Sequence, residues 1–172
     1  MCLLFFAWVF IVLWRMDFFH WLQRIWKRVR YYQLAKQTAH ALDLPLMVVG
    51  DPYGGPTNSV MGAFYGCGDV TVDIQGSRCP HTIQADLTEA LKTLPDRSYV
   101  IFVSLVLEYV DDLAACFKEL QRVSGGHLFI VHVQPSSRIS RDRYSSGRHS
   151  PPAVNRIYKA PPEYPDIEYT TF

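Results

Sequence analysis

Residues 46–55 read LMVVGDPYGG, and this stretch decides the fold. Its first four residues form an apolar run of strand length. Continuous rather than alternating hydrophobicity is typical of a parallel strand that is buried on both faces. Gly50 follows directly, and a glycine pair ends the stretch, so the backbone turns tightly and lets a ligand approach. Pro52 and Tyr53 stand where small residues are expected, and Pro52 removes one backbone donor from the turn.

A second apolar run, residues 70–73, ends in Asp73. An acid about 20 residues after a glycine turn of this kind accepts hydrogen bonds from ribose hydroxyls in nucleotide-binding folds. The alternative role for Asp73 is local, because a strand-end aspartate often caps the next turn. Residues 82–86 form a third short run that ends in Asp86, which either approaches a ligand or caps the following helix.

Strand and helix patterns alternate along the rest of the body. Further strands are expected at 99–104 and 127–133, and a helix with regular apolar spacing is expected from Asp111 or Asp112 to Val123. This alternation predicts an α/β fold with a small, Rossmann-like, mostly parallel sheet. Two more strands, at 154–158 and 167–172, are expected to add an antiparallel hairpin to the sheet edge.

The N-terminal segment has a different character, because residues 1–14 are all apolar and all four tryptophans lie within the first 26 residues. Three interpretations compete: a membrane-spanning helix over residues 1–22, an interfacial helix anchored by tryptophan, and a cleaved signal peptide. The signal peptide is the weakest, because no basic segment precedes the apolar run. The sequence therefore predicts a membrane partner that is contacted through residues 1–30.

Basic residues follow the apolar run at Arg24, Lys27, Arg28, Arg30 and Lys36. The positive-inside bias then predicts a membrane-associated protein whose body faces the cytoplasm. The expected organisation is a hydrophobic and basic anchor helix over 1–36 and a Rossmann-like core over 37–134. A Ser-, Arg- and Pro-rich loop with the strand hairpin completes the chain over 135–172.

Charge and cysteine content narrow the function further. The formal net charge is only +1, which gives no specific nucleic-acid signal. The cysteines at positions 2, 67, 79 and 116 form no CxxC pair, so separate reduced thiols are expected. A metal cluster built from Cys67, Cys79 and His81 is the less favoured alternative, and no metal site is predicted.

Two segments resemble the class I S-adenosylmethionine-dependent methyltransferases. Residues 103–131, VSLVLEYVDDLAACFKELQRVSGGHLFIV, look like the fourth strand, following helix and fifth strand of that family, and the spacing from the glycine turn to Asp73 also fits. The chain is more similar still to short methyltransferase-like proteins of large DNA viruses, which share a pattern GDP-x-GG, GCGD, LEYVDD and RVSGG. The match covers about residues 44–134.

The resemblance implies a cofactor site for S-adenosylmethionine. The glycines of the turn would line its methionine part, Asp73 its ribose and Asp86 its adenine, while Glu108 and Tyr109 would face the substrate; their alternative role is in loops and caps. The family's acid before the first glycine falls on Val48 in one alignment and on Asp51 in another. The implied cofactor-binding residues are Gly50, Asp51, Gly54, Gly55, Asp73, Asp86, Glu108 and Tyr109.

Two functions follow as expectations. One is a membrane-anchored methyltransferase-like domain that binds S-adenosylmethionine and transfers a methyl group to an unknown acceptor, with no catalytic residue that can be named. The other is a non-catalytic structural protein at a membrane or in a virion, such as a viral minor capsid protein or a capsid-to-membrane linker. The bulky Pro52–Tyr53 turn favours the second, and the intact spacing to Asp73 favours the first.

Overall fold

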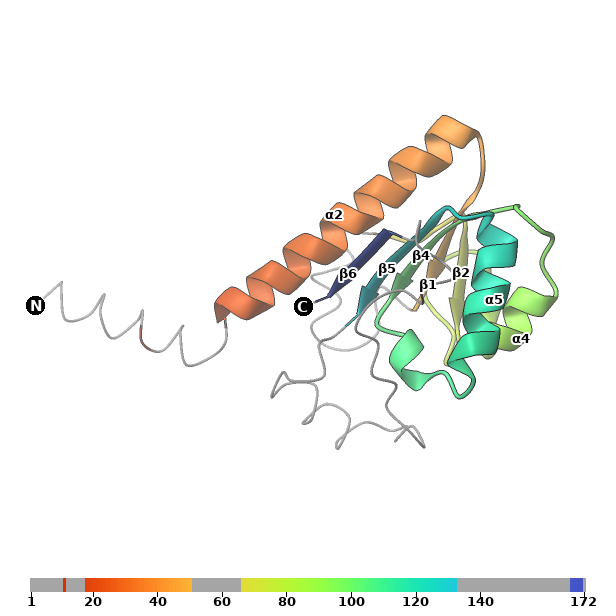
Figure 1. Cartoon of the computed structure of the whole chain (residues 1–172). Helices are drawn as coiled ribbons and strands as arrows, with labels where there is room; N and C mark the ends of the chain where they lie inside the picture. Colours follow the sequence, from red (N-terminus) through yellow and green to blue (C-terminus); the bar gives the residue numbers. More distant parts are fainter. Residues whose placement is uncertain (1–10, 12–17, 51–65, 133–167, 172) are drawn as a thin grey trace, which may run out of the picture.

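A computed structural model of the chain describes residues 11, 18–50, 66–132 and 168–171 (Figure 1). These residues form a parallel sheet with helices on both faces. The elements in chain order are α2 (Phe18–Leu42), β1 (Leu46–Val49), β2 (Val70–Asp73), β3 (Thr82–Gln84), α4 (Leu87–Lys92), β4 (Val100–Ser104), the 3-10 helix η1 (Leu107–Tyr109), α5 (Leu113–Ser124), β5 (Leu128–His132) and β6 (Glu168–Thr171).

The sheet confirms the α/β, Rossmann-like prediction. Its strand order is β3-β2-β1-β4-β5-β6, and every pair of neighbouring strands is parallel. This is the order of an open doubly wound sheet, in which the strand sequence reverses direction between β1 and β4. Parallel strands need cover on both faces, which explains why the runs around Val48, Phe102 and Ile130 are apolar without alternation.

Side chains alternate between two hydrophobic cores, one on each face of the sheet. Met47, Ile101 and Ile130 point toward the layer made by α4 and α5. Val48, Phe102 and Val131 point toward α2 on the opposite face. Figure 1 shows α2 on one side of the sheet and α4 with α5 on the other.

Helix α2 runs without a break from the expected anchor helix over 1–36 into the expected core, and among the described residues it is the helix that covers one face of the sheet. Its buried residues Tyr32, Ala35 and Ala39 recur at helical spacing and pack against β4 and β5. The expected boundary between residues 36 and 37 therefore lies inside a continuous helix that belongs to the core. Within the described part of the chain, no helix is both long enough and apolar enough to cross a membrane.

The last described strand corrects one expectation. Residues 168–171 form β6, which pairs with β5 in parallel and not as half of an antiparallel hairpin. A strand that pairs in parallel with its neighbour starts at the same end of the sheet, so the chain has to cross back to that end first. A tight hairpin turn does not make this crossing. The expected strand at 154–158 lies outside the described residues.

The GCGD segment, residues 66–69, fastens the amino ends of β1 and β2. The Tyr32 hydroxyl donates to the Cys67 carbonyl at 3.2 Å, and the Leu46 amide donates to Asp69 Oδ2 at 2.8 Å. A Cβ on Gly68 would lie 2.4 Å from the Leu46 carbonyl oxygen, so only glycine fits against β1 there. This segment lies at the amino ends of the strands, whereas the ligand site is expected at their carboxyl ends.

Cys67 is also disulfide-bonded to Cys79, with the two Cα atoms 5.4 Å apart. The expectation of separate reduced thiols is therefore wrong for this pair. Residues 74–81 join the parallel strands β2 and β3 without a helix, and the disulfide ties that connection to the start of β2. Cys116 is a free, buried cysteine, and burial raises its pKa to about 12, which keeps the thiol protonated.

Arg122, from the RVSGG motif, joins α5 to the end of α4. Its guanidinium donates to the carbonyl oxygens of Leu91 and Leu94 at 2.8 and 2.9 Å and also contacts Asp96 and Glu119. Two hydrogen bonds raise the pKa of Arg122 above its ordinary value. The bond to Asp96 has the larger effect and the bond to Glu119 the next largest. Both the GCGD and the RVSGG motifs therefore have structural roles in this chain.

We expect Gly68→Ala to lower the free energy of unfolding by about 3 kcal/mol, because the new methyl group would overlap backbone atoms of β1. Gly66→Ala is the matched control. Among the described residues, a Cβ at Gly66 meets only the Tyr32 hydroxyl, at 3.5 Å, so its effect should stay within about 0.5 kcal/mol. Urea denaturation of the full chain in mild detergent measures both changes, and equal losses would contradict the assigned role of Gly68.

We expect the double substitution Cys67→Ser and Cys79→Ser to lower the free energy of unfolding by about 3 kcal/mol, the value for closing a loop of this size. The measurement is urea denaturation without reductant. Adding a reductant should shift the wild-type midpoint toward that of the double variant and leave the double variant unchanged. A wild-type midpoint that does not respond to reductant would show that the bond does not stabilise the fold.

Candidate functional site

The candidate site lies at the edge of the sheet where the parallel strands end, here called the carboxyl edge. Ligands of open α/β sheets bind outside this edge, where the strand order reverses. In this chain the reversal lies between β1 and β4, since β1 pairs with β2 on one side and with β4 on the other. Gly50, Asp73 and Ser104 stand at the ends of these three strands.

Gly50 has the backbone conformation that only glycine adopts readily. Its φ is +93°, and its amide donates to the Val72 carbonyl at 2.9 Å. A Cβ there would lie 2.8 Å from Val106 Cγ2 and 2.9 Å from the Ser104 carbonyl oxygen. Glycine is therefore required for the close approach of β1 to the segment after β4, whether or not a ligand binds.

Asp73 is half-buried, and its Oδ1 accepts a hydrogen bond from the Gln75 amide at 2.7 Å. This is the turn-capping role considered for it from the sequence. The same hydrogen bond holds the carboxylate at the carboxyl edge, beside the strand that carries Gly50. The structure therefore places Asp73 at the carboxyl edge and also gives it a local partner.

Of the two roles considered for Asp86, ligand contact and helix capping, the structure shows helix capping. Its Oδ1 accepts from the amides of Thr88 at 2.8 Å and Glu89 at 3.4 Å, at the start of α4. Asp112 caps α5 in the same way through the Ala115 amide at 3.0 Å. Both hydrogen bonds to Asp86 go to Oδ1, so the cap uses one oxygen of the carboxylate and leaves Oδ2 as an acceptor.

The remaining predicted residues divide between the described and the undescribed parts of the chain. Glu108 and Tyr109 lie in η1, directly after β4, and the Tyr109 side chain is 43% exposed. Asp51, Gly54 and Gly55 lie outside the described residues. Of the eight predicted cofactor-binding residues, the structure therefore brings Gly50 and Asp73 together on neighbouring strands, with Tyr109 at the same edge.

Sequence reasoning missed the buried pair Arg28 and Ser104. Arg28 Nε donates to Ser104 Oγ at 2.9 Å, and both residues are buried. The signal was present in the spacing, because Arg28 precedes Tyr32, Ala35 and Ala39 by four, seven and eleven residues on the inward face of α2. A guanidinium is thereby fixed behind the carboxyl edge, next to the last residue of β4.

Three kinds of polar group lie at or behind the carboxyl edge. It combines a close backbone approach at Gly50, a carboxylate at Asp73 and a positive charge at Arg28. Among the described residues, no group of three or more His, Cys, Asp or Glu side chains is arranged to hold a metal ion. The metal cluster considered at Cys67 and Cys79 is replaced by their disulfide.

Comparison with protein-family models, with curated proteins and with solved structures finds no significant match for this chain. The class of protein is therefore given by the fold alone, an α/β protein with a Rossmann-like parallel sheet. Such folds carry many unrelated functions, so the function has to be argued from the carboxyl edge itself.

We expect Ser104→Ala to lower the free energy of unfolding by about 1–3 kcal/mol, because it removes the acceptor of the buried Arg28 Nε donor. Ser98→Ala is the control, since the Ser98 hydroxyl donates to the Pro95 carbonyl at an exposed position and should matter by about 0.5 kcal/mol or less. Thermal or urea denaturation compares the two. A smaller loss for Ser104→Ala than for Ser98→Ala would rule out a stabilising contact.

Proposed function

We propose that this chain is a membrane-anchored methyltransferase-like domain whose carboxyl edge binds S-adenosylmethionine. The observation that supports it is the adjacency of Gly50 and Asp73 at the ends of paired strands, with the Gly50 amide bonded to the Val72 carbonyl. A nucleoside needs this combination, since the glycine lets the backbone approach and the acid binds the ribose hydroxyls. Methyl transfer requires alignment of a nucleophile with the sulfonium rather than strong acids or bases, so no catalytic residue is proposed.

Membrane association is part of the proposal and is supported by residues 1–30. Arg15, Met16 and Asp17 separate the apolar residues 1–14 from α2, which itself contains no acidic residue. Aromatic and basic side chains together suit the headgroup region of an anionic bilayer.

The disulfide bears on the compartment. Disulfides form and persist at cell and virion surfaces and in other oxidising environments, and they are rare in a reducing cytoplasm. The bond between Cys67 and Cys79 therefore supports a body on the oxidising side of a membrane or in a virion. The cytoplasmic orientation expected from the basic residues is accordingly not part of the proposal.

A second candidate function is architectural, a non-catalytic assembly protein that uses the same fold at a membrane, for example a viral minor capsid protein or a capsid-to-membrane linker. The observation that favours it is that both candidate acids have local partners. Asp73 accepts from the Gln75 amide, and Asp86 caps α4. In that case the hydrogen bonds of both acids serve only to stabilise the carboxyl edge, which binds no nucleoside.

Calorimetric titration of the full chain with S-adenosylmethionine separates the two functions. For the first function we expect micromolar binding that Asp73→Asn weakens at least about tenfold, because hydrogen bonds to a charged group contribute about 1.5–3 kcal/mol. Asparagine retains the acceptor for the Gln75 amide, so the turn is preserved.

Asp112→Asn is the matched control for that titration. It alters the same kind of capping aspartate at the same edge, at the start of α5, and should leave the affinity unchanged. Absence of binding in the wild-type chain would refute the cofactor proposal and favour the architectural one. Equal weakening by Asp73→Asn and Asp112→Asn would show that Asp73 does not contact the ligand.

A further inference from the structure

Charge is distributed unevenly between the two faces of the sheet. Helix α2, the described layer on one face, carries five lysine or arginine residues and no aspartate or glutamate. The described residues outside α2, at 43–50, 66–132 and 168–171, carry eleven acidic side chains and five lysine or arginine side chains. Five of these acids belong to α4, α5 or the residues that lead into them: Asp86, Glu89, Asp111, Asp112 and Glu119. The small net charge of the chain therefore combines a positive α2 layer with a negative body.

The side of α2 that faces away from the sheet is one exposed stripe. The opposite side is buried at Arg28, Tyr32, Ala35 and Ala39. Six exposed residues follow one another along α2 at intervals of three or four: Leu22, Trp26, Arg30, Gln33, Gln37 and Ala41. Residues at these intervals lie on one face of a helix, here called the outward stripe. Figure 1 shows α2 along one side of the sheet, with α4 and α5 on the other.

The outward stripe begins with apolar side chains beside a cation. Leu22 and Trp26 are 40% and 59% exposed, and the Arg30 guanidinium lies 5.3 Å from the centre of the Trp26 ring. This cation–π contact joins the aromatic and the charged side chain in one patch. Tryptophan and arginine together are typical of the boundary between an anionic bilayer and water. A purely polar polyanion would leave Leu22 and Trp26 exposed to water, whereas a bilayer buries them.

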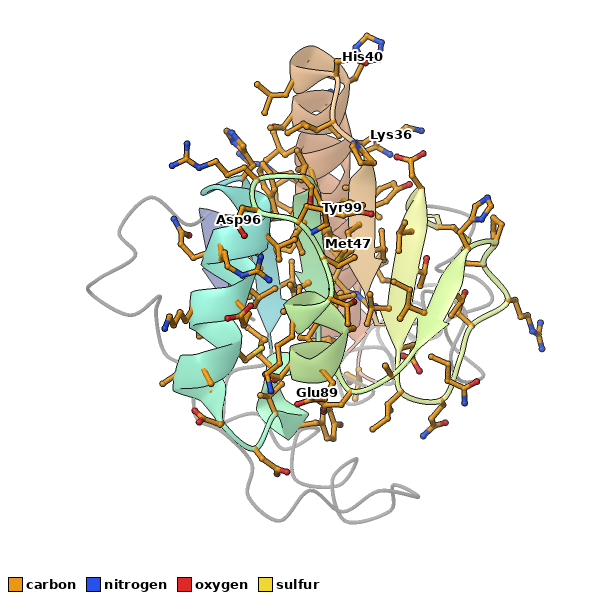
Figure 2. All side chains as sticks on the ribbon, turned by 90° about the vertical axis from the view of Figure 1, so that its right-hand side faces the viewer. Lys36, His40, Met47, Glu89, Asp96 and Tyr99 are labelled. Carbon is orange, nitrogen blue, oxygen red and sulfur yellow. A yellow bond between two sulfur atoms is a disulfide. The ribbon has the colours of Figure 1, made fainter. Side chains whose placement is uncertain are left out.

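Basic residues flank the outward stripe, and no acid interrupts it. By helical spacing Lys27 and Lys36 lie on its two sides, the first half-buried and the second exposed. Figure 2 shows Lys36 and His40 on α2, at the far end of the molecule from Glu89 of α4. The next acid in the sequence, Asp43, follows the end of the helix. Since each basic residue near an anionic surface adds to binding, such a surface matches the α2 face and not the acidic face of α4 and α5.

We propose that α2 lies along an anionic bilayer, with the outward stripe against the lipid headgroups and the acidic layer of α4 and α5 turned away. The sheet then lies parallel to the membrane plane. The carboxyl edge, with Gly50 and Asp73, opens sideways along the membrane surface, so a ligand reaches it from the adjacent water. This orientation rests on the membrane association proposed above and adds to it which face of the body meets the lipid. It does not depend on the identity of the cofactor.

Three labelled positions test this orientation in the full chain. Gln33→Cys and Ala41→Cys lie on the outward stripe, and Ala114→Cys lies at an exposed position of α5. Ala41 and Ala114 are a matched pair, because both are exposed alanines in helices on opposite faces of the sheet. Each variant carries the same fluorophore, and quenching by a nitroxide on the lipid headgroup measures how close the label lies to the membrane surface.

The label has to react at the introduced cysteine alone. Each variant is therefore made in a Cys2→Ser background and labelled without reductant. Cys67 and Cys79 are then blocked by their disulfide, and Cys116 is buried with its pKa raised to about 12.

The labelled proteins are reconstituted into phosphatidylcholine vesicles that contain about one-third phosphatidylserine and the headgroup nitroxide lipid. We expect similar quenching at positions 33 and 41. Both should be quenched at least about threefold more than position 114, because α2 itself, about 10 Å across, and the sheet lie between the headgroups and α5. In vesicles of phosphatidylcholine alone, quenching at positions 33 and 41 should fall toward that at position 114.

A charge reversal tests whether the basic residues of α2 hold this face on the lipid. Lys36→Glu should lower the quenching at position 33 by at least about half, because it replaces an attractive charge beside the outward stripe with a repulsive one. Lys118→Glu is the matched control, since Lys118 is an exposed lysine on α5. It should leave the quenching at position 33 unchanged.

Other results overturn the orientation. Quenching at position 41 as weak as at position 114 means that α2 stands upright and meets the bilayer only through its first turns. Equal quenching at all three positions, or the strongest quenching at position 114, means that another face or no preferred face meets the lipid. Equal effects of Lys36→Glu and Lys118→Glu contradict the role of the α2 charges.

Each of these contrary results leaves the membrane anchor and the cofactor proposal intact. Failure of the full chain to float with the vesicles refutes the orientation together with the anchor. The titration with S-adenosylmethionine still tests the candidate site separately, so failure of the orientation and failure of the cofactor proposal are distinguishable.

Discussion

The packing of α2 across β4 and β5 is the contact on which the rest of the structure depends. A parallel sheet is stable in water only when both faces are covered, and in the described chain α2 covers one of them. Tyr32 shows how much one residue of this helix connects. Its ring packs edge-on against Phe102 at 5.8 Å, and its hydroxyl binds the Cys67 carbonyl. Helix α2 and the sheet are therefore one packed unit.

The class of fold was predictable because hydrophobic runs and glycine stops are local signals. The run at 46–49, the helix that ends at Gly125 and the run at 128–132 all lie close to where their patterns placed them. The extent of α2 was obscured by composition. Its inward face mixes Arg28 and Tyr32 with small alanines, so the usual apolar stripe is weak. The disulfide escaped prediction because pairing depends on the spatial approach of two connections.

The candidate site was also predictable only in part. Gly50 was identified through its type and position, and steric contacts with Val106 and Ser104 explain why glycine is needed. An aspartate at the end of a strand can bind a ligand or cap a turn. The sequence does not separate these roles, because both use the carboxylate oxygens. The structure assigns Asp86 to a cap and gives Asp73 a partner without moving it from the edge. Arg28 could not be located without knowing which strand α2 crosses.

The short edge strand β3 limits how copies of this chain can pair through their sheets. This edge strand has three residues and is followed directly by a capped helix. An edge strand exposes unpaired backbone groups, and a long, flat one recruits the edge of a second sheet. A three-residue edge offers too few such groups to start a continuous intermolecular sheet. Copies of this chain brought to high concentration should therefore not pair through β3.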